Sequence, residues 1–116
     1  MTITVYGIPN CDTVKRARGW LEAHDIPYQF HDFKKAGVPA SRLQAWLQAV
    51  GWEALVNRKG TTWRKLDDAT RAGVADDASA ASLMAAQASV IKRPVVEWAD
   101  GGVTVGFDAA EWARRA

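Results

Sequence analysis

The residue best suited to carry out chemistry is Cys11, the single cysteine in a chain of 116 residues. It closes the stretch YGIPNC, in which a strand-like run passes through a Gly/Pro turn and leads at once into a helical pattern. The start of a helix presents unpaired N–H groups and a partial positive charge, and both favour the thiolate form of a cysteine. The alternative is a buried filler, because free cysteine is among the residue types most often found inside proteins.

Basic residues near Cys11 favour the reactive interpretation. With Asn10 as N-cap, Cys11 is the first helical residue, and Lys15 lies one turn further along the same helical face. Arg16 and Arg18 add positive charge nearby. Such surroundings lower the pKa of a cysteine thiol from about 8.5 to roughly 3.5–7.5, so the sequence predicts a nucleophilic thiolate at this position.

Two other segments contain candidate binding residues. In SVIKRPVVEW, Pro94 opens a predicted strand and the bond before it can be cis, while Arg93 offers a fork of donors for an oxyanion or a carboxylate. In VNRKGTTWRKL, we expect Arg58 and Lys59 to meet the charged end of a substrate. The alternative for both segments is a set of solvated surface cations, with an ordinary proline at a strand start in the first.

The elements that must position these residues begin with a strand over residues 2–6, whose apolar residues alternate with polar ones. A helix from Asp12 to about residue 24 follows, and then a second strand over residues 27–33. A strand–helix–strand unit of this length predicts two parallel strands joined by a right-handed crossover.

The middle of the chain is predicted to be mostly helical. A first helix has Ser41 as its N-cap and ends at Gly51, and a short helix begins at residue 61 or 62. An Ala-rich helix over residues 78–88 has Asp77 as a candidate N-cap. The apolar face of the first helix consists of Leu43, Trp46, Leu47 and Val50.

The last third returns to strands. The runs VVEW and GVTVGF, joined by ADGG, predict an antiparallel hairpin. The final run DAAEWARR resembles a capping box, with Asp108 as N-cap and Glu111 at the third helical position.

This order of elements predicts the α/β class and a thioredoxin-like fold with a mixed four-stranded sheet and helices on both faces. We expect one domain over residues 1–116, with a helical insert at about residues 38–90. In such a fold the first strand–helix corner is the reactive end, and a cis proline at the position of Pro94 faces the thiol at Cys11.

The composition of the chain excludes several classes of function and site. Hydrophobic residues make up 48% of the chain and the formal net charge is +2, too small to indicate nucleic-acid binding. One cysteine excludes an internal disulfide and a cysteine-based zinc site, and neither His24 nor His31 has a second ligand at metal spacing, so no metal is expected. Without a signal-peptide pattern or a run of about 18 apolar residues, we expect a cytoplasmic monomer that makes no membrane contact.

Three segments, YGIPNCDTVKRARGWLEAHDIPYQFHDFKKAGV, LVNRKGTTWRKL and IKRPVVEW…VGF, together resemble the arsenate reductase (ArsC) and Spx family, and most closely its YffB-type subgroup. The resemblance covers essentially the whole chain. It implies a thioredoxin-like fold with a helical insert, a catalytic cysteine at Cys11, an oxyanion-binding arginine at Arg93, and the proline that follows it at Pro94.

The sequence also departs from the family pattern. The family's first arsenate-binding arginine falls on Asn57, with Arg58 adjacent, and its third falls near Gly106. The polar residues that flank the cysteine in arsenate reductases are replaced by Gly7 and Val14. Since Val14 also occupies the second position of the Cys-x-x-Cys found in Spx regulators, an internal disulfide switch is excluded.

The resulting prediction is a thiol–disulfide oxidoreductase that uses one cysteine. An external thiol must release the mixed disulfide, and glutathione is the expected co-substrate because its carboxylates require cations such as Arg93, Arg58 or Lys59. The subgroup is often interpreted as glutathione-dependent thiol reductases, and glutaredoxin is a possible protein partner. The alternatives are an arsenate reductase and an Spx-like protein that binds the transcription machinery.

Overall fold

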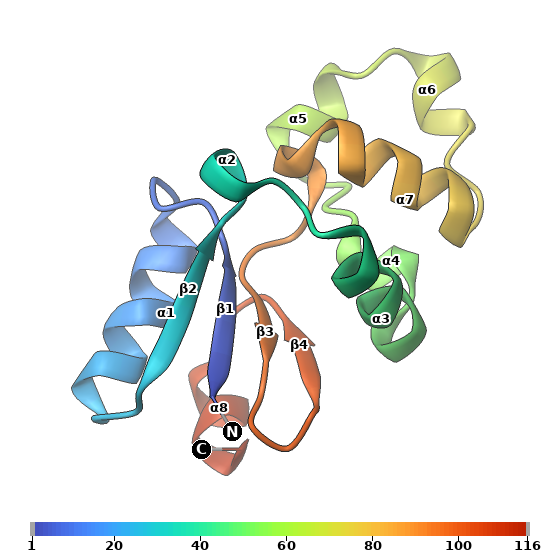
Figure 1. Ribbon diagram of the computed structural model, residues 1–116. Helices are drawn as coiled ribbons and strands as arrows, with labels where there is room; N and C mark the ends of the chain where they lie inside the picture. Colours follow the sequence, from blue (N-terminus) through green and yellow to red (C-terminus); the bar gives the residue numbers. More distant parts are fainter. Residues whose placement is uncertain (1, 116) are drawn as a thin grey trace. The chain divides into compact units, whose positions relative to one another are not determined.

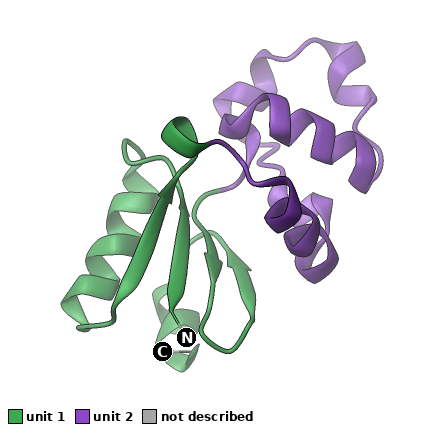
Figure 2. Ribbon diagram, viewed as in Figure 1, with its two compact units in different colours: residues 1–36, 93–116 green, residues 37–92 purple. Residues whose placement is uncertain are grey.

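The computed structural model describes residues 2–115, and the chain divides into two compact units (Figure 2). Unit 1 combines residues 1–36 with residues 93–116, and unit 2 consists of residues 37–92. Unit 1 contains the β-sheet, whereas the regular elements of unit 2 are helices. The helical block expected at about residues 38–90 lies within unit 2, and its description as an insert in a single domain stays a prediction.

The sheet of unit 1 has four strands in the order β2-β1-β3-β4 (Figure 1). Strand β1 (Ile3–Gly7) pairs in parallel with β2 (Tyr28–Asp32), and helix α1 (Asp12–Ala23) connects them. Strand β3 (Val95–Glu97) pairs antiparallel with β1 and with β4 (Val103–Val105). This mixed sheet and the predicted α/β class are confirmed.

Two helices pack against one face of this sheet. Residues at alternate positions of β1, such as Val5, point toward α1, which contributes Ala17 and Leu21. Helix α8 (Ala109–Arg115) contributes Trp112 to the same core. The ring of Trp112 meets those of its aromatic neighbours at nearly right angles, with centroids 4.8–5.8 Å apart: Trp20, Trp98 and Phe107.

The opposite face of the sheet carries an aromatic group near the end of β1. Tyr6 lies 5.0 Å from the ring of His31 and 6.3 Å from the ring of Phe33, which begins the short helix α2 (Phe33–Ala36). The hydroxyl of Tyr6 donates a hydrogen bond of 2.9 Å to Glu97 on β3. This face of the sheet therefore has ordered contacts near the end of β1, where the chain leads toward α1.

Unit 2 is built from short helices followed by a 3₁₀ turn. Backbone hydrogen bonds tie its last residues to the segment that ends α4, because Asn57 donates to Val90 at 2.8 Å and Lys92 donates to Leu55 at 2.7 Å. The elements are α3 (Ala40–Val50), α4 (Trp52–Leu55), α5 (Thr61–Lys65), α6 (Asp68–Ala72), α7 (Asp77–Ala86) and η1 (Ala88–Val90).

The predicted helix ends in unit 2 are correct in two places and wrong in two. Gly51, with φ of 83°, ends α3, and Thr61 begins α5, as expected. Ser41 is not an N-cap, because α3 already begins at Ala40 after Pro39. The N-cap of α7 is Asp76 instead of Asp77, since the carboxylate of Asp76 accepts the N–H of Ser79 at 2.9 Å.

Candidate functional site

The candidate site is the corner between β1 and α1. Cys11 is itself the N-cap of α1, with an extended backbone (φ −140°, ψ 124°), and its carbonyl accepts the first helical hydrogen bond from Lys15 at 2.9 Å. The expectation that Asn10 is the N-cap is therefore wrong by one residue. Asn10 lies in the exposed bend before the helix, and Cys11 occupies the place where serine or aspartate usually caps.

As N-cap, the sulfur of Cys11 faces the second and third N–H groups of the helix. The uncharged thiol closes no capping hydrogen bond of its own. Partial burial has the largest single effect on the pKa of Cys11 and raises it. The N–H of Val14, the hydrogen bond and charge of Arg93, and the N–H of Thr13 together outweigh burial, so the pKa of Cys11 lies below its ordinary value.

Arg93 reaches this corner because β3 runs antiparallel to β1. Val95 pairs with Tyr6 near the end of β1, which places the residues before Val95 at the same end of the sheet as Cys11. Arg93 is half-buried, and the hydrogen bond and the charge that its guanidinium offers the sulfur both lower the pKa of Cys11. The Arg93–Pro94 peptide bond is cis, and Pro94 is fully buried at the start of β3.

Asn10 directly precedes Cys11 and Lys15 follows it by four residues, and both side chains are exposed. Lys15 follows the sulfur by one helical turn, as its spacing predicts, but its ammonium is not among the groups that lower the pKa of Cys11. Their assignment to substrate binding stays a prediction.

Arg58 and Lys59 belong to unit 2 and are exposed in the turn that follows α4. The guanidinium of Arg58 lies 5.6 Å from the ring centroid of Trp52 and 4.0 Å from the carboxylate of Glu53. The side-chain oxygen of Asn57 accepts the N–H of Lys59 at 3.3 Å, which shapes the turn. A role for this turn in meeting an anionic substrate likewise stays a prediction.

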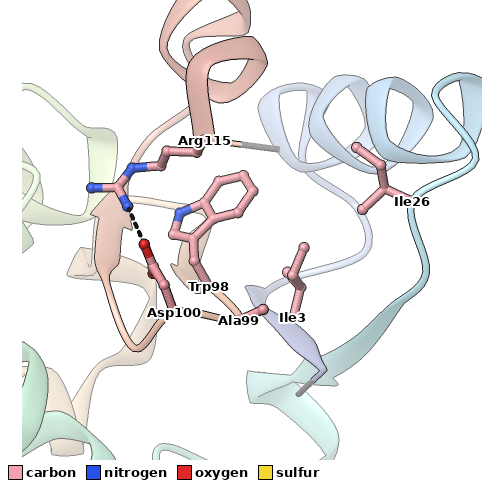
Figure 3. Close-up of a pocket in the computed structure, with 6 residues that line it drawn as sticks. All are labelled: Ile3, Ile26, Trp98, Ala99, Asp100 and Arg115. Atoms are coloured by element: carbon pink, nitrogen blue, oxygen red, sulfur yellow. Dashed lines mark ion pairs between the residues drawn. The ribbon is translucent and has the colours of Figure 1, made fainter.

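A cavity of about 280 Å³ lies at the other end of the sheet of unit 1 (Figure 3). Its walls are mostly apolar, and at its edge the guanidinium of Arg115 lies 3.9 Å from the carboxylate of Asp100. Ile3 begins β1 and Trp98 follows β3, so this cavity is separated from Cys11 by the length of β1. The remaining wall residues are Ile26 and Ala99.

Residues 2–115 contain neither a metal-binding cluster nor a membrane-spanning helix. No group of three or more His, Cys, Asp or Glu side chains is placed to hold a metal ion. Within that same range, none of the helices has the length and apolar character needed to cross a bilayer.

From the sequence alone, unpaired N–H donors near Cys11 were expected only because every helix start presents them. The sequence did not identify Thr13 and Val14 as the residues whose N–H groups face the sulfur, because that assignment depends on which residue is the N-cap. A position one residue earlier would have directed different N–H groups toward Cys11. The signal available was the helical periodicity from Asp12 onward, which places the preceding residue outside the helix.

Comparison with known proteins gives a consistent family assignment. The sequence model of the ArsC family matches residues 6–115. An uncharacterized protein of Haemophilus influenzae is 41% identical over 110 residues, which are 95% of each chain. The solved structure of a protein named YffB has a TM-score of 0.93 and 46% identity, covering 98% of both chains. An arsenate reductase (ArsC) related protein from Brucella melitensis has a TM-score of 0.77 and 54% identity, covering 98% of this chain and 93% of its own.

Proposed function

Because this chain belongs to the ArsC family, whose sequence model spans nearly all of it, we propose that it is a glutathione-dependent thiol reductase with Cys11 as its nucleophile. The observation that carries the proposal is the position of Cys11 as N-cap of α1, with two helical N–H groups and the guanidinium of Arg93 directed at its sulfur. The thiolate is the nucleophilic form of cysteine, and these donors increase its population at a given pH.

The first proposed step is thiol–disulfide exchange. The thiolate of Cys11 attacks the glutathione sulfur of a mixed disulfide R–S–S–G, and a new S–S bond to Cys11 forms as the S–S bond of the substrate breaks. The substrate leaves as a thiolate and takes a proton from water, so its sulfur is reduced while the sulfur of Cys11 is oxidised.

The second step regenerates the thiolate. Since Cys11 is the only cysteine in the chain, the attacking thiol has to come from outside. A second glutathione thiolate attacks the glutathione sulfur of the Cys11 mixed disulfide, releasing oxidised glutathione and the Cys11 thiolate. The balance is R–S–S–G plus one reduced glutathione giving R–SH plus one oxidised glutathione.

Arg93 has a distinct task in each state. It stabilises the free thiolate by a hydrogen bond and by its charge. When Cys11 enters a disulfide, the negative charge on the sulfur disappears, and the guanidinium becomes available for a carboxylate of bound glutathione. When glutathione leaves, the guanidinium is again available to the sulfur, so release of glutathione and recovery of the thiolate favour one another.

The proposal is tested with a small glutathione mixed disulfide as substrate. We expect the reduced protein to convert it with consumption of reduced glutathione, and intact mass to show one glutathione on the oxidised protein. Cys11→Ser is the matched control and should show neither the added mass nor turnover above the uncatalysed exchange. A wild-type protein that accepts no glutathione at Cys11 would refute the proposal.

Arsenate reduction is a second candidate, favoured by the guanidinium beside the sulfur and by the similarity to the Brucella melitensis arsenate reductase-related protein. The residues at Asn57 and Gly106 carry no positive charge with which to hold the oxyanion. We therefore expect no arsenite to form when arsenate, reduced glutathione and active glutaredoxin are supplied together. Arsenite formation that is lost in Cys11→Ser would replace the first candidate with the second.

A further inference from the structure

Gly7, the last residue of β1, lies where a side chain would have no room. A Cβ atom built on its backbone would lie 2.9 Å from Cγ2 of Val14 and 3.6 Å from Cγ1. It would also lie 3.9 Å from the ring of Phe30, which is an ordinary contact. The space that a side chain would need at Gly7 is thus already filled by the methyl groups of Val14.

Val14 cannot give way easily. It is fully buried in unit 1 and lies on the first turn of α1. A β-branched side chain in a helix has one strongly preferred rotamer, so its methyl groups cannot rotate out of the way without strain. A side chain at Gly7 would therefore push on the backbone of the first turn of the helix.

The same residue also faces the sulfur. The N–H of Val14 is the largest single cause that lowers the pKa of Cys11, and the N–H of the neighbouring Thr13 acts in the same direction. Val14 thus connects two contacts, one through its side chain to Gly7 and one through its backbone to Cys11.

We propose that Gly7 is a positioning residue, whose missing side chain lets Val14 pack against the end of β1 and thereby holds the first N–H groups of α1 at the sulfur of Cys11. The inference rests on the proposed function, since the position of these N–H groups matters only if Cys11 reacts as a thiolate. It also gives a physical reason why glycine at position 7 occurs together with valine at position 14, the two positions that flank Cys11.

The charges around the sulfur stay the same under this proposal. Arg93, on the segment before β3, is the charged group that lowers the pKa of Cys11. Asp12 and Lys15 are the charged side chains of the first turn of α1, and both are exposed. Substitutions at Gly7 or Val14 leave all three in place, so they act on the sulfur through packing and backbone position.

The test measures the alkylation rate of Cys11 by iodoacetamide in four proteins: wild type, Gly7→Ala, Gly19→Ala, and the double variant Gly7→Ala/Val14→Ala. About one pH unit below the wild-type midpoint, we expect Gly7→Ala to react roughly three- to tenfold more slowly, a pKa rise of about half a unit to one unit. Well above pH 8.5, where the Cys11 thiol is ionised in all four proteins, their alkylation rates should converge. Gly19 is the matched control because nothing lies within 4 Å of a Cβ at that position of α1.

The double variant tests the direction of the effect. Removing the two γ-methyl groups of Val14 makes room for Ala at position 7, and the pair loses only one methyl group in total, so we expect its rate to return to within about twofold of wild type. A Gly7→Ala protein that folds and alkylates like wild type at the lower pH overturns the inference, and so does a double variant as slow as Gly7→Ala.

The inference stays testable if Gly7→Ala fails to fold. If Gly7→Ala does not fold, the double variant should fold, and Val14→Ala alone should alkylate more slowly because nothing then holds the first turn against Gly7. Loss of folding in the double variant, or an unchanged rate in Val14→Ala, would contradict the inference. If the wild-type midpoint is that of an ordinary cysteine, about 8.5, the proposed function itself fails first.

Discussion

Helices α1 and α7 begin in the same way but are capped by different chemistry. In α7 the carboxylate of Asp76 accepts the N–H of Ser79 at 2.9 Å, and the hydroxyl of Ser79 accepts the N–H of Asp76 at 3.1 Å. This reciprocal capping box satisfies both donors within the helix. In α1 the residue at the capping position is Cys11, and its neutral thiol closes no such bond.

Under the proposed function, one structural position serves stability in one helix and reactivity in the other. The carboxylate of Asp76 is permanently charged near neutral pH, and its hydrogen bonds to Ser79 lower its pKa further. The sulfur of Cys11 is a good acceptor only as a thiolate, so the helix start favours ionisation of the group that caps it. Forming a disulfide removes that charge, and the same donors then favour the return of the thiolate as a leaving group.

Cys11→Ser should remove the difference between the two helix starts most completely. Serine is a good N-cap, so α1 should stay folded and the free energy of unfolding should change little. The thiol chemistry should be lost altogether, because a serine hydroxyl is not ionised at these pH values and forms no disulfide. Intact mass after incubation with oxidised glutathione, together with denaturant unfolding, checks both outcomes. Mixed disulfide formation in this variant would contradict the assignment of Cys11.

Loss of Arg93 should have the next largest effect on the rate of exchange at Cys11. Removing a hydrogen bond to a charged group changes an equilibrium by roughly tenfold or more, so we expect Arg93→Ala to slow exchange at neutral pH by about that factor. Arg93→Lys should lie between, since it keeps the charge and loses the fork of donors. Steady-state turnover of the glutathione mixed disulfide measures the effect.

The adjacent cation Lys92, which is exposed, supplies the control for Arg93. We expect Lys92→Ala to turn over the mixed disulfide at the wild-type rate. Equal losses in Lys92→Ala and Arg93→Ala would point to a general effect of surface charge and against a specific role of Arg93 at the sulfur.

Asp76→Ala tests the contribution of the cap at the start of α7. It removes the cap of α7, so the midpoint of thermal unfolding should fall, and Asp76→Ser should recover most of the loss because serine also caps. The pH dependence of alkylation at Cys11 should not change in either variant. A stability unaffected by Asp76→Ala would mean that the capping box contributes nothing measurable to the fold.

The smallest expected effect is a pH dependence of stability that comes from Cys11 alone. Because folding lowers the pKa of Cys11, the unfolded chain holds the thiol proton more tightly. This stabilisation is therefore fully present above the unfolded pKa of about 8.5 and is lost as the pH falls through the folded pKa. Denaturant unfolding of the reduced protein, minus that of Cys11→Ser at each pH, isolates it. A difference that falls as the pH rises would have the wrong sign.

The order of elements was predictable because it depends on periodicity, which the chain shows clearly. The apolar positions of α1 recur at helical spacing, and the two runs that form β3 and β4 flank a glycine turn. Helix starts were less predictable, since Asn10 and Ser41 are better capping types than the residues that occupy those places. Packing against the rest of the fold decides where a helix begins, and it overrode the local preference in both cases.

The contact between Arg93 and Cys11 spans most of the chain, so no local pattern reveals it. The sequence reached it only through the predicted topology and the family resemblance. The close approach of Gly7 and Val14 had a local signal, because glycine at the end of a strand often marks a place where another group packs tightly. That signal did not name the partner, which depends on how α1 lies on the sheet.

The activation of Cys11 by its helix start is tested most directly by titrating its thiol in the reduced protein, followed by the ultraviolet absorbance of the thiolate, with Cys11→Ser as the blank. We expect a midpoint clearly below the value of about 8.5 found for a free cysteine. A midpoint at or above that value would mean that burial outweighs the N–H groups and Arg93, and it would contradict the claim that this helix start activates its cysteine.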